Sequence, residues 1–110
     1  MATSKEYLNY VLEQLSGLKD ISHRMMMGEY IIYYNGRILG GIYDNRFLVK
    51  PVKSAVKLMP DALFESPYKG AKEMILVNKL DDKEFLTELV TEMYDELSEP
   101  KKRKNDLKFK

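Results

Sequence analysis

The chain has 110 residues, of which 45% are apolar and 32% are charged, and its formal net charge at pH 7 is +1. This length predicts one domain built on a single core. The sequence contains no cysteine, which excludes disulfides, thiolate zinc sites and cysteine nucleophiles. The first ten residues lack a long apolar run and predict neither a signal peptide nor a membrane span, so we expect a cytoplasmic protein.

Charge is distributed unevenly along the chain. Residues 101–110 carry six Lys or Arg and one acid, whereas residues 1–99 carry 12 basic and 16 acidic residues. We therefore predict a folded domain over residues 1–99 and a basic disordered tail over 100–110. The tail predicts weak, nonspecific contact with nucleic acid, because contacts to phosphate carry no base information. The tail residues expected to make it are Lys101, Lys102, Arg103 and Lys104.

Two segments have apolar residues at helical spacing. Thr3 and Glu6 predict a capping box at the start of a first helix of about four turns. Asp81 and Glu84 show the same pattern ahead of a second amphipathic helix near the end of the domain. A shorter helix is expected over residues 54–59.

Runs of β-branched and aromatic residues between these helices predict strands. Asn35-Gly36 and Asp44-Asn45 suit two-residue hairpin turns, so the first runs should form a meander. The strands are expected over residues 25–34, 37–43, 46–51, 62–64 and 74–79. The predicted order is helix, three strands, helix, two strands, helix. This order indicates an α+β fold whose antiparallel sheet has helices packed mainly on one face.

Counting outward from the two turns predicts which residues lie opposite one another in the meander. The predicted pairs are Ile31 with Gly40, Tyr33 with Ile38, Ile42 with Phe47, and Gly40 with Val49. This almost wholly apolar face is expected to be the core, and Gly40 would let a helix approach closely.

The opposite face of the meander combines apolar and cationic side chains. Because one helix layer covers one side of a sheet, we expect a partner here: a second copy in a homodimer, or a transcription-related protein. The candidate partner-binding residues are Tyr30, Ile32, Tyr34, Arg37, Tyr43, Arg46, Leu48 and Lys50. Two alternatives stay open, namely coverage by the chain's own last helix and loops, and nucleic-acid binding by the same tyrosines and cations.

Candidate chemistry centres on His23, the only histidine in the chain. No Ser, Asp or Glu pattern beside it marks a nucleophile or an orienting partner, so we predict no catalytic residue, no metal, no cofactor and no enzyme. The adjacent run Met25–Met27 predicts core filling, and Gly28 predicts a bulge or bend before the strand continues. The alternative is a small-molecule-binding protein or enzyme with a pocket near His23, Arg24 and Met25–Met27.

Three segments carry a resemblance to a known family. "MMGEY", "YNGRILGGIYDNRFLVK" and "PYKGAKEMILV" together resemble the N-terminal domain of the TfoX (TfoX/Sxy type) family of bacterial competence regulators, over residues 4–97. The resemblance implies regulation of genes for DNA uptake and natural transformation, and a two-layer α+β fold similar to that of secretion chaperones. It supplies no catalytic residue. Full-length regulators carry a second, helical domain where this chain has its basic tail. We expect a non-enzymatic regulatory or protein-interaction module.

Overall fold

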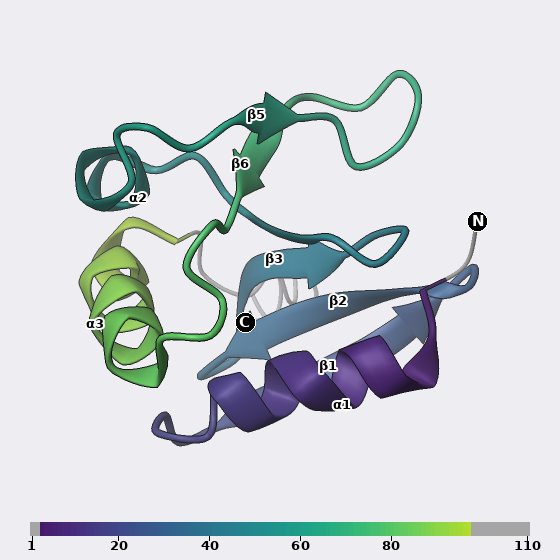
Figure 1. Ribbon diagram of the computed structural model, residues 1–110, viewed down its shortest axis with the longest axis horizontal. Helices are drawn as coiled ribbons and strands as arrows, with labels where there is room; N and C mark the ends of the chain where they lie inside the picture. The colour runs from purple at the N-terminus through teal and green to yellow at the C-terminus, as the bar shows by residue number, and fades with distance from the viewer. Residues whose placement is uncertain (1–2, 98–110) are drawn as a thin grey trace, which may run out of the picture.

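The computed structural model describes residues 3–97, which fold into one antiparallel sheet of six strands with three α-helices (Figure 1). In chain order the elements are α1 (Lys5–Gln14), β1 (Ile21–Met26), β2 (Glu29–Tyr34), β3 (Arg37–Ile42), β4 (Phe47–Val49), α2 (Lys53–Leu58), β5 (Phe64–Glu65), β6 (Met74–Leu76), α3 (Lys83–Met93) and the 3-10 turn η1 (Tyr94–Glu96). The strand order across the sheet is β1-β2-β3-β4-β6-β5. The predicted α+β class and antiparallel sheet are confirmed, with one strand more than expected.

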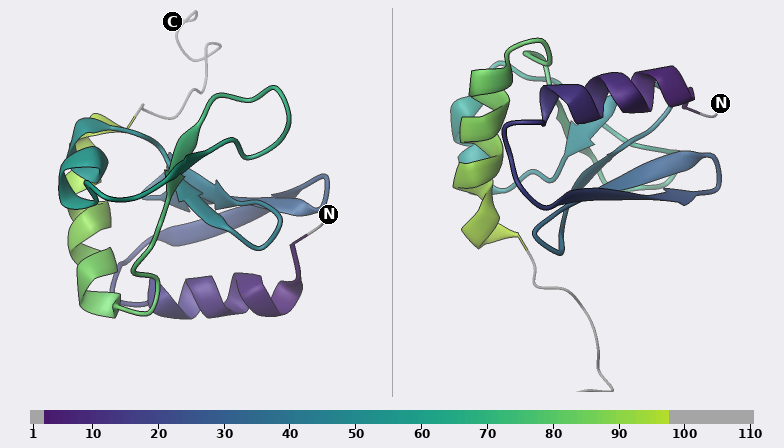
Figure 2. Two further views of the ribbon diagram at one scale, coloured as in Figure 1. Left: turned by 45° about the horizontal axis from the view of Figure 1, so that its top comes forward. Right: turned by 90° about the horizontal axis from the view of Figure 1, so that it is seen from below.

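The helices gather on one side of the sheet. In the right-hand view of Figure 2, α1 lies above the β1–β2 hairpin and α3 stands beside it, across the end of the strands. Within residues 3–97 no helix covers the other side of β1, β2 and β3. We call this side the helix-free face. None of the helices in the described part of the chain is long and apolar enough to cross a membrane.

The core lies between the helices and the sheet. Apolar residues of α1 and α3 recur on one stripe, as an amphipathic helix requires, and meet inward-facing residues of the strands. The fully buried contributors of the helices and their caps are Val11, Leu15, Ala55, Leu86, Leu89, Val90 and Met93, and those of the strands are Ile32, Leu39, Ile42 and Val49.

The first predicted strand is in fact two strands. The chain reverses at Met27 and Gly28, whose φ angles of 54° and 86° match those of the two-residue turn at Asn35 and Gly36, 54° and 84°. The turn at Asp44-Asn45 was predicted correctly. At Gly28 a bulge or bend within one continuing strand was predicted, whereas the chain turns back there into a separate strand. Positive φ is uncommon for methionine, so Met-Gly is a weak turn signal.

The bulge lies instead in β3, and it changes which residues face the core. Tyr33 pairs with Ile38 as predicted, but Ile32, and not Ile31, pairs with Gly40. Leu39 is the extra residue and is fully buried. The predicted pairs of β3 with β4 are confirmed, because the slip lies within the β2–β3 ladder.

The bulge therefore reverses the predicted faces of β2. Residues Tyr30 and Ile32 face the helices, whereas Ile31 and Tyr33 point to the helix-free face. Gly40 also has another role than predicted. A Cβ there would lie 2.1 Å from the backbone oxygen of Leu48, so the glycine admits the neighbouring strand and not a helix.

The two long helices begin at side-chain caps. Ser4 is the N-cap of α1 and accepts a hydrogen bond from the backbone N–H of Tyr7, whereas Thr3, the predicted cap, is buried. Asp82 caps α3 by accepting from the N–H of Phe85, one residue after the predicted position. Both predictions identified the helix correctly and placed its cap one residue too early.

Candidate functional site

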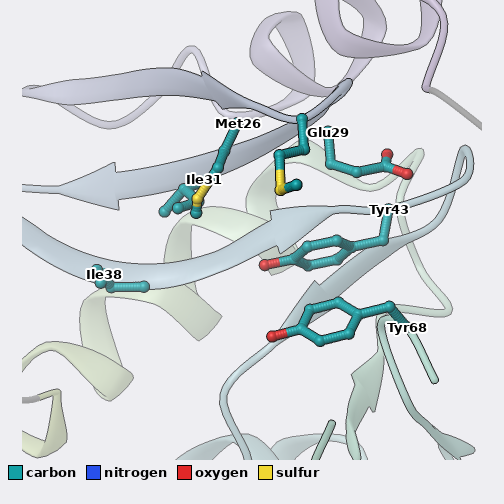
Figure 3. Close-up of a pocket in the computed structure, with 7 residues that line it drawn as sticks. Met26, Glu29, Ile31, Ile38, Tyr43 and Tyr68 are labelled. Atoms are coloured by element: carbon teal, nitrogen blue, oxygen red, sulfur yellow. The ribbon is translucent and has the colours of Figure 1, made fainter. Parts of the chain in front are cut away.

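A hollow opens on the helix-free face, with a cavity volume of about 560 Å³. This volume lies within the range of about 300–1,000 Å³ that is typical of ligand sites. Its walls are mainly apolar and come from three separate parts of the chain. The lining residues are Met26, Met27, Glu29, Ile31, Ile38, Tyr43 and Tyr68 (Figure 3).

Two tyrosines form one wall of the hollow. Tyr43 follows β3 and Tyr68 lies in the loop between β5 and β6. Their ring centroids are 6.3 Å apart at an interplanar angle of 62°. Figure 3 shows both hydroxyl groups pointing the same way, across the hollow toward Ile38. The wall thus offers aromatic surface together with two groups that can donate or accept a hydrogen bond.

Gly41 makes room for the Tyr43 ring. A Cβ on this glycine would lie 2.6 Å from the Tyr43 hydroxyl oxygen and 2.7 Å from the backbone oxygen of Tyr30. Any larger residue would have to displace the ring or the neighbouring strand. The second glycine of "GGIYDNR" is therefore tied to the shape of the hollow.

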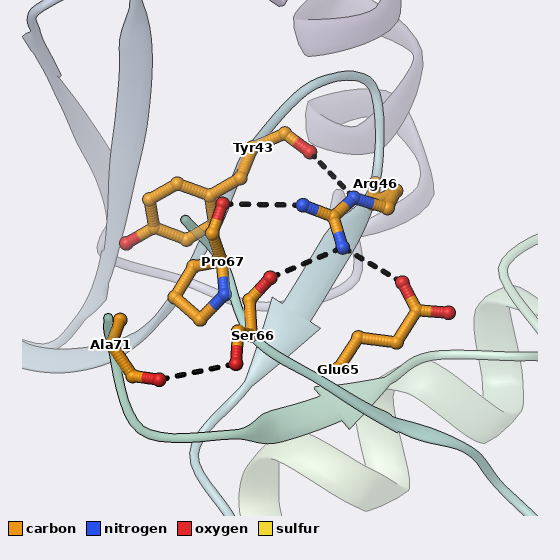
Figure 4. A network of polar contacts seen from close by, with 6 residues as sticks. All are labelled: Tyr43, Arg46, Glu65, Ser66, Pro67 and Ala71. Atoms are coloured by element: carbon orange, nitrogen blue, oxygen red, sulfur yellow. Dashed lines mark hydrogen bonds and ion pairs between the residues drawn. The ribbon is translucent and has the colours of Figure 1, made fainter. Parts of the chain in front are cut away.

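Arg46 holds the β5–β6 loop against the β3–β4 turn (Figure 4). Its Nη1 lies 2.7 Å from Glu65 Oε1, and its guanidinium also donates to the carbonyl oxygens of Ser66 and Pro67. Nε donates to the carbonyl oxygen of Tyr43 at 3.1 Å. One side chain thus joins the two segments that carry the tyrosine wall, and a planar five-donor group is suited to that task.

Glu29 fixes the opposite end of the site. Its Oε1 accepts a hydrogen bond from the Thr3 hydroxyl at 2.6 Å and another from the backbone N–H of Asp44 at 3.0 Å. The Thr3 hydroxyl in turn accepts from the N–H of Asn45. This carboxylate ties β2 to the β3–β4 turn and to the start of α1, so the rim of the hollow is preorganised.

The pKa of Tyr43 is raised above its ordinary value. Burial is the largest cause, and the neighbouring Tyr68, Glu29 and Tyr33 add to it. The Tyr43 phenol therefore stays neutral even in moderately alkaline solution.

The structure separates the eight residues predicted to bind a partner. Tyr30, Ile32 and Leu48 are buried, with exposed fractions of 8%, 0% and 0%, so their predicted place on an open face is wrong. Tyr30 and Ile32 are buried because the bulge in β3 changes the pairing and turns them toward the helices. Tyr43 alone of the eight lines the hollow. Lys50 is half-buried just beyond β4.

Tyr34 and Arg37 hold the end of the last helix. Arg37 donates to the carbonyl oxygens of Tyr94 and Leu97, and its guanidinium carbon lies 4.2 Å from the centre of the Tyr94 ring. The ring of Tyr34 meets the same ring edge-on at 5.5 Å. Arg37 and Arg46 are two of the three cations predicted for the partner-binding face, and both contact other residues of the same chain.

The alternative pocket near the methionines is only partly found. Met26 and Met27 line the hollow. His23 and Met25 lie opposite Ile32 and Tyr30 and so belong to the other face of the sheet, where the His23 ring meets the Tyr30 ring at 5.8 Å. Arg24 is exposed in β1. Among residues 3–97 no three His, Asp or Glu side chains are grouped to hold a metal ion. The predicted nucleic-acid contacts of 101–104 lie outside the described residues.

Sequence reasoning missed Glu29, Ile31, Ile38 and Tyr68 as site residues. A signal was nevertheless present, since the three motif segments meet at the hollow. "MMGEY" supplies three lining residues, the "YNGRILGGIYDNRFLVK" segment supplies two and "PYKGAKEMILV" supplies Tyr68. Only Ile31 lies outside the motifs.

No family model matches the chain, and no solved structure matches it. The chain is similar to an uncharacterized 12.7 kDa protein encoded in the trpE 5' region of Spirochaeta aurantia, with 32% identity over 73 residues. The similar segment spans 66% of this chain and 64% of the Spirochaeta protein.

Proposed function

We propose that this protein is a non-enzymatic protein-interaction module that binds an apolar segment of a protein partner in the hollow of the helix-free face. On the resemblance of its motifs to the TfoX N-terminal domain, we further propose that the partner belongs to the machinery of gene regulation, with competence as the regulated process.

One observation carries this proposal: the three motif segments, which span residues 26–30, 34–50 and 67–77, converge on one hollow. They contribute Met26, Met27, Glu29, Ile38, Tyr43 and Tyr68 to its lining. Residues that share only a role in the core would be expected between the helices and the sheet. These residues instead surround an open, apolar surface, which is typical of an interaction site.

The chemistry of the lining suits a peptide. Methionine adapts its shape to irregular apolar groups, and Met27 is 96% exposed beside the hollow. The tyrosine hydroxyls can satisfy backbone N–H or C=O groups of an extended segment, because each both donates and accepts. Aromatic residues and methionine are also enriched at protein interfaces.

The size of the hollow also favours a second candidate, a small apolar ligand. A volume of about 560 Å³ is enough for such a molecule. This candidate corresponds to the alternative predicted from the sequence, a pocket near Met25–Met27, but the hollow lies on the helix-free face and only Met26 and Met27 line it.

The test compares the native protein with Ile38→Glu, which places a charge on the hollow where the side chain is 39% exposed. Val56→Glu is the matched control, since Val56 is 42% exposed on α2, away from the hollow. Each form is expressed in the native cell at its natural level, cross-linked and purified. We expect one protein partner to be captured by the native form and Val56→Glu and to be lost with Ile38→Glu, together with any effect on DNA uptake.

Capture of the same partners by all three forms would contradict the proposal. Native mass spectrometry of the purified protein separates the two candidates. An apolar molecule that copurifies with the native form and Val56→Glu, but not with Ile38→Glu, would favour the small-ligand function instead.

A further inference from the structure

Strand β1 lies at the edge of the sheet and pairs with β2 on one side only. Five of its six residues are exposed, and its pairing with β2 runs without a register shift from Ile21 to Met26. The strand "ISHRMM" contains no proline, no lysine and no bulge. These are among the features by which natural edge strands avoid pairing with another chain, and Arg24 is the one Lys, Arg, Asp or Glu residue that the strand contains.

The phase of the ladder shows which backbone groups of β1 point outward. The N–H of Asn35 donates to the carbonyl oxygen of Asp20 at 2.9 Å, so this pair is a hydrogen-bonded one. Hydrogen-bonded and non-hydrogen-bonded pairs alternate along an antiparallel ladder. Ile21, His23 and Met25 therefore occupy non-hydrogen-bonded positions toward β2, and their N–H and C=O groups point away from it, at the edge.

We propose that a second copy of this chain docks at this edge, with the two β1 strands antiparallel and His23 opposite its own symmetry mate. The two sheets would then continue as one across the two-fold axis. This surface is independent of the hollow, so the inference does not rest on the proposed function.

Symmetry restricts the register. A two-fold axis that continues a sheet is perpendicular to it and keeps each residue on its own face, so one residue must lie directly opposite itself. With His23 at the axis, Ile21 lies opposite Met25 of the other copy. All three outward residues of each copy then meet outward residues, which gives about six hydrogen bonds at two for each such pair.

The neighbouring register toward the turn is less favourable. With Arg24 at the axis, the two guanidinium groups would lie directly opposite each other on one face, and like charges so placed destabilise a sheet. Ile21 would then oppose Met27, which is in the turn and not in the strand. The His23 register instead sets Arg24 opposite Ser22, a small polar residue.

A second copy also fits this edge better than an unrelated strand. The outward N–H and C=O groups belong to Ile21, His23 and Met25, which are spaced evenly about His23. When a second copy of the strand runs antiparallel, each outward N–H therefore meets an outward C=O. The pair of Ile21 and Met25 brings two apolar side chains together on each side of the axis. Met25 is 61% exposed in the single chain and would be covered there.

Backbone pairing is tested with two substitutions at one residue, His23→Pro and His23→Ala. Proline removes the outward N–H at the axis and leaves the bonds to β2 intact, which an edge strand tolerates. Alanine removes the imidazole and keeps the N–H. Analytical ultracentrifugation at micromolar concentration should show a dimer for the native protein and His23→Ala, and a monomer with native circular dichroism for His23→Pro.

The register is tested by cross-linking, since the native chain has no cysteine. In the proposed dimer, His23→Cys brings two Cα atoms to about 5.5 Å, within disulfide range. Arg24→Cys leaves them roughly 8 Å apart, which is too far. Under mild oxidation, His23→Cys should form a covalent dimer at least tenfold faster than Arg24→Cys.

Three results would overturn the inference. They are a monomer at every concentration, faster cross-linking of Arg24→Cys, and a His23→Pro protein that still dimerises. Ile38→Glu separates this inference from the proposed function, because it should leave the dimer unchanged. A dimer that Ile38→Glu breaks and His23→Pro does not would place the second copy on the helix-free face.

Discussion

The two faces of the sheet are both rich in apolar residues, but the chain uses them differently. Toward the helices, Ile32, Ile42 and Val49 have no exposed surface. On the helix-free face, Ile38 is 39% exposed and Met26 is 48% exposed. The comparison teaches that apolar content does not identify a core, since the same residue types line a buried layer and an open hollow a few ångströms apart.

The largest expected effect comes from matched isoleucines on the two faces. Ile32→Ala leaves a cavity in the core and should lower the free energy of unfolding by about 3 kcal/mol. Ile38→Ala, in the neighbouring strand, should lower it by about 1 kcal/mol or less, because its side chain is partly solvated. Urea unfolding followed by circular dichroism measures both. Equal losses for the two variants would show that the faces are not distinct.

A smaller effect is expected at the clamp that builds the helix-free face. Arg46→Gln removes the ion pair with Glu65 and the hydrogen bonds to the β5–β6 loop, and should destabilise the fold by about 2 kcal/mol. Amide hydrogen exchange should rise in residues 65–71. The control is Lys83→Gln, which breaks an exposed ion pair with Glu13 and should cost about 0.5 kcal/mol or less. Unchanged exchange in the loop would show that Arg46 does not hold it.

The smallest effect is expected in how the stability of the fold depends on pH, because Tyr43 lies on the helix-free face. Burial raises the pKa of Tyr43 in the folded protein above the unfolded value of 10.0, so the folded state holds this proton more tightly. Its contribution to stability is present below pH 10 and is lost as the pH rises through the raised pKa. Tyr43→Phe should weaken this alkaline loss, measured by unfolding between about pH 9 and 11. Part of it should remain, because burial also raises the pKa of Tyr7. An identical alkaline loss in both proteins would contradict the assignment.

The order of helices and strands could be predicted from sequence wherever a local signal was strong. Asn35-Gly36 and Asp44-Asn45 identified two hairpins, because these residues adopt positive φ readily. The hairpin between β1 and β2 was missed, because its turn residue Met27 has a φ of 54° but Met-Gly is not a common turn pair. Tertiary pairing of β1 with β2 holds the turn, and no local pattern reports it.

The site could be predicted much less well than the fold. Leu39 shifts the β2–β3 register by one residue, and one residue is enough to turn a predicted interface into core. Arg46 was expected to meet a partner because it was assigned to the face of the meander that combines apolar and cationic side chains. Its acceptors are instead the Glu65 side chain and three backbone carbonyls of the same chain. These contacts cannot be predicted from a local sequence pattern, because the fold is what brings Glu65, Ser66 and Pro67 next to Arg46.

The exposed methionines at the tip of the β1–β2 hairpin should make the protein sensitive to oxidants. Met27 is 96% exposed and Met25 is 61% exposed, whereas Met59 and Met93 are 4% and 0% exposed in the core. Peroxide converts an accessible thioether into a polar sulfoxide, which reductases can reverse. Met27 lines the hollow and Met25 lies on the dimer edge proposed above, so mild oxidation would make both surfaces more polar before it reached the core. Peptide mass spectrometry after brief peroxide treatment would show this order directly.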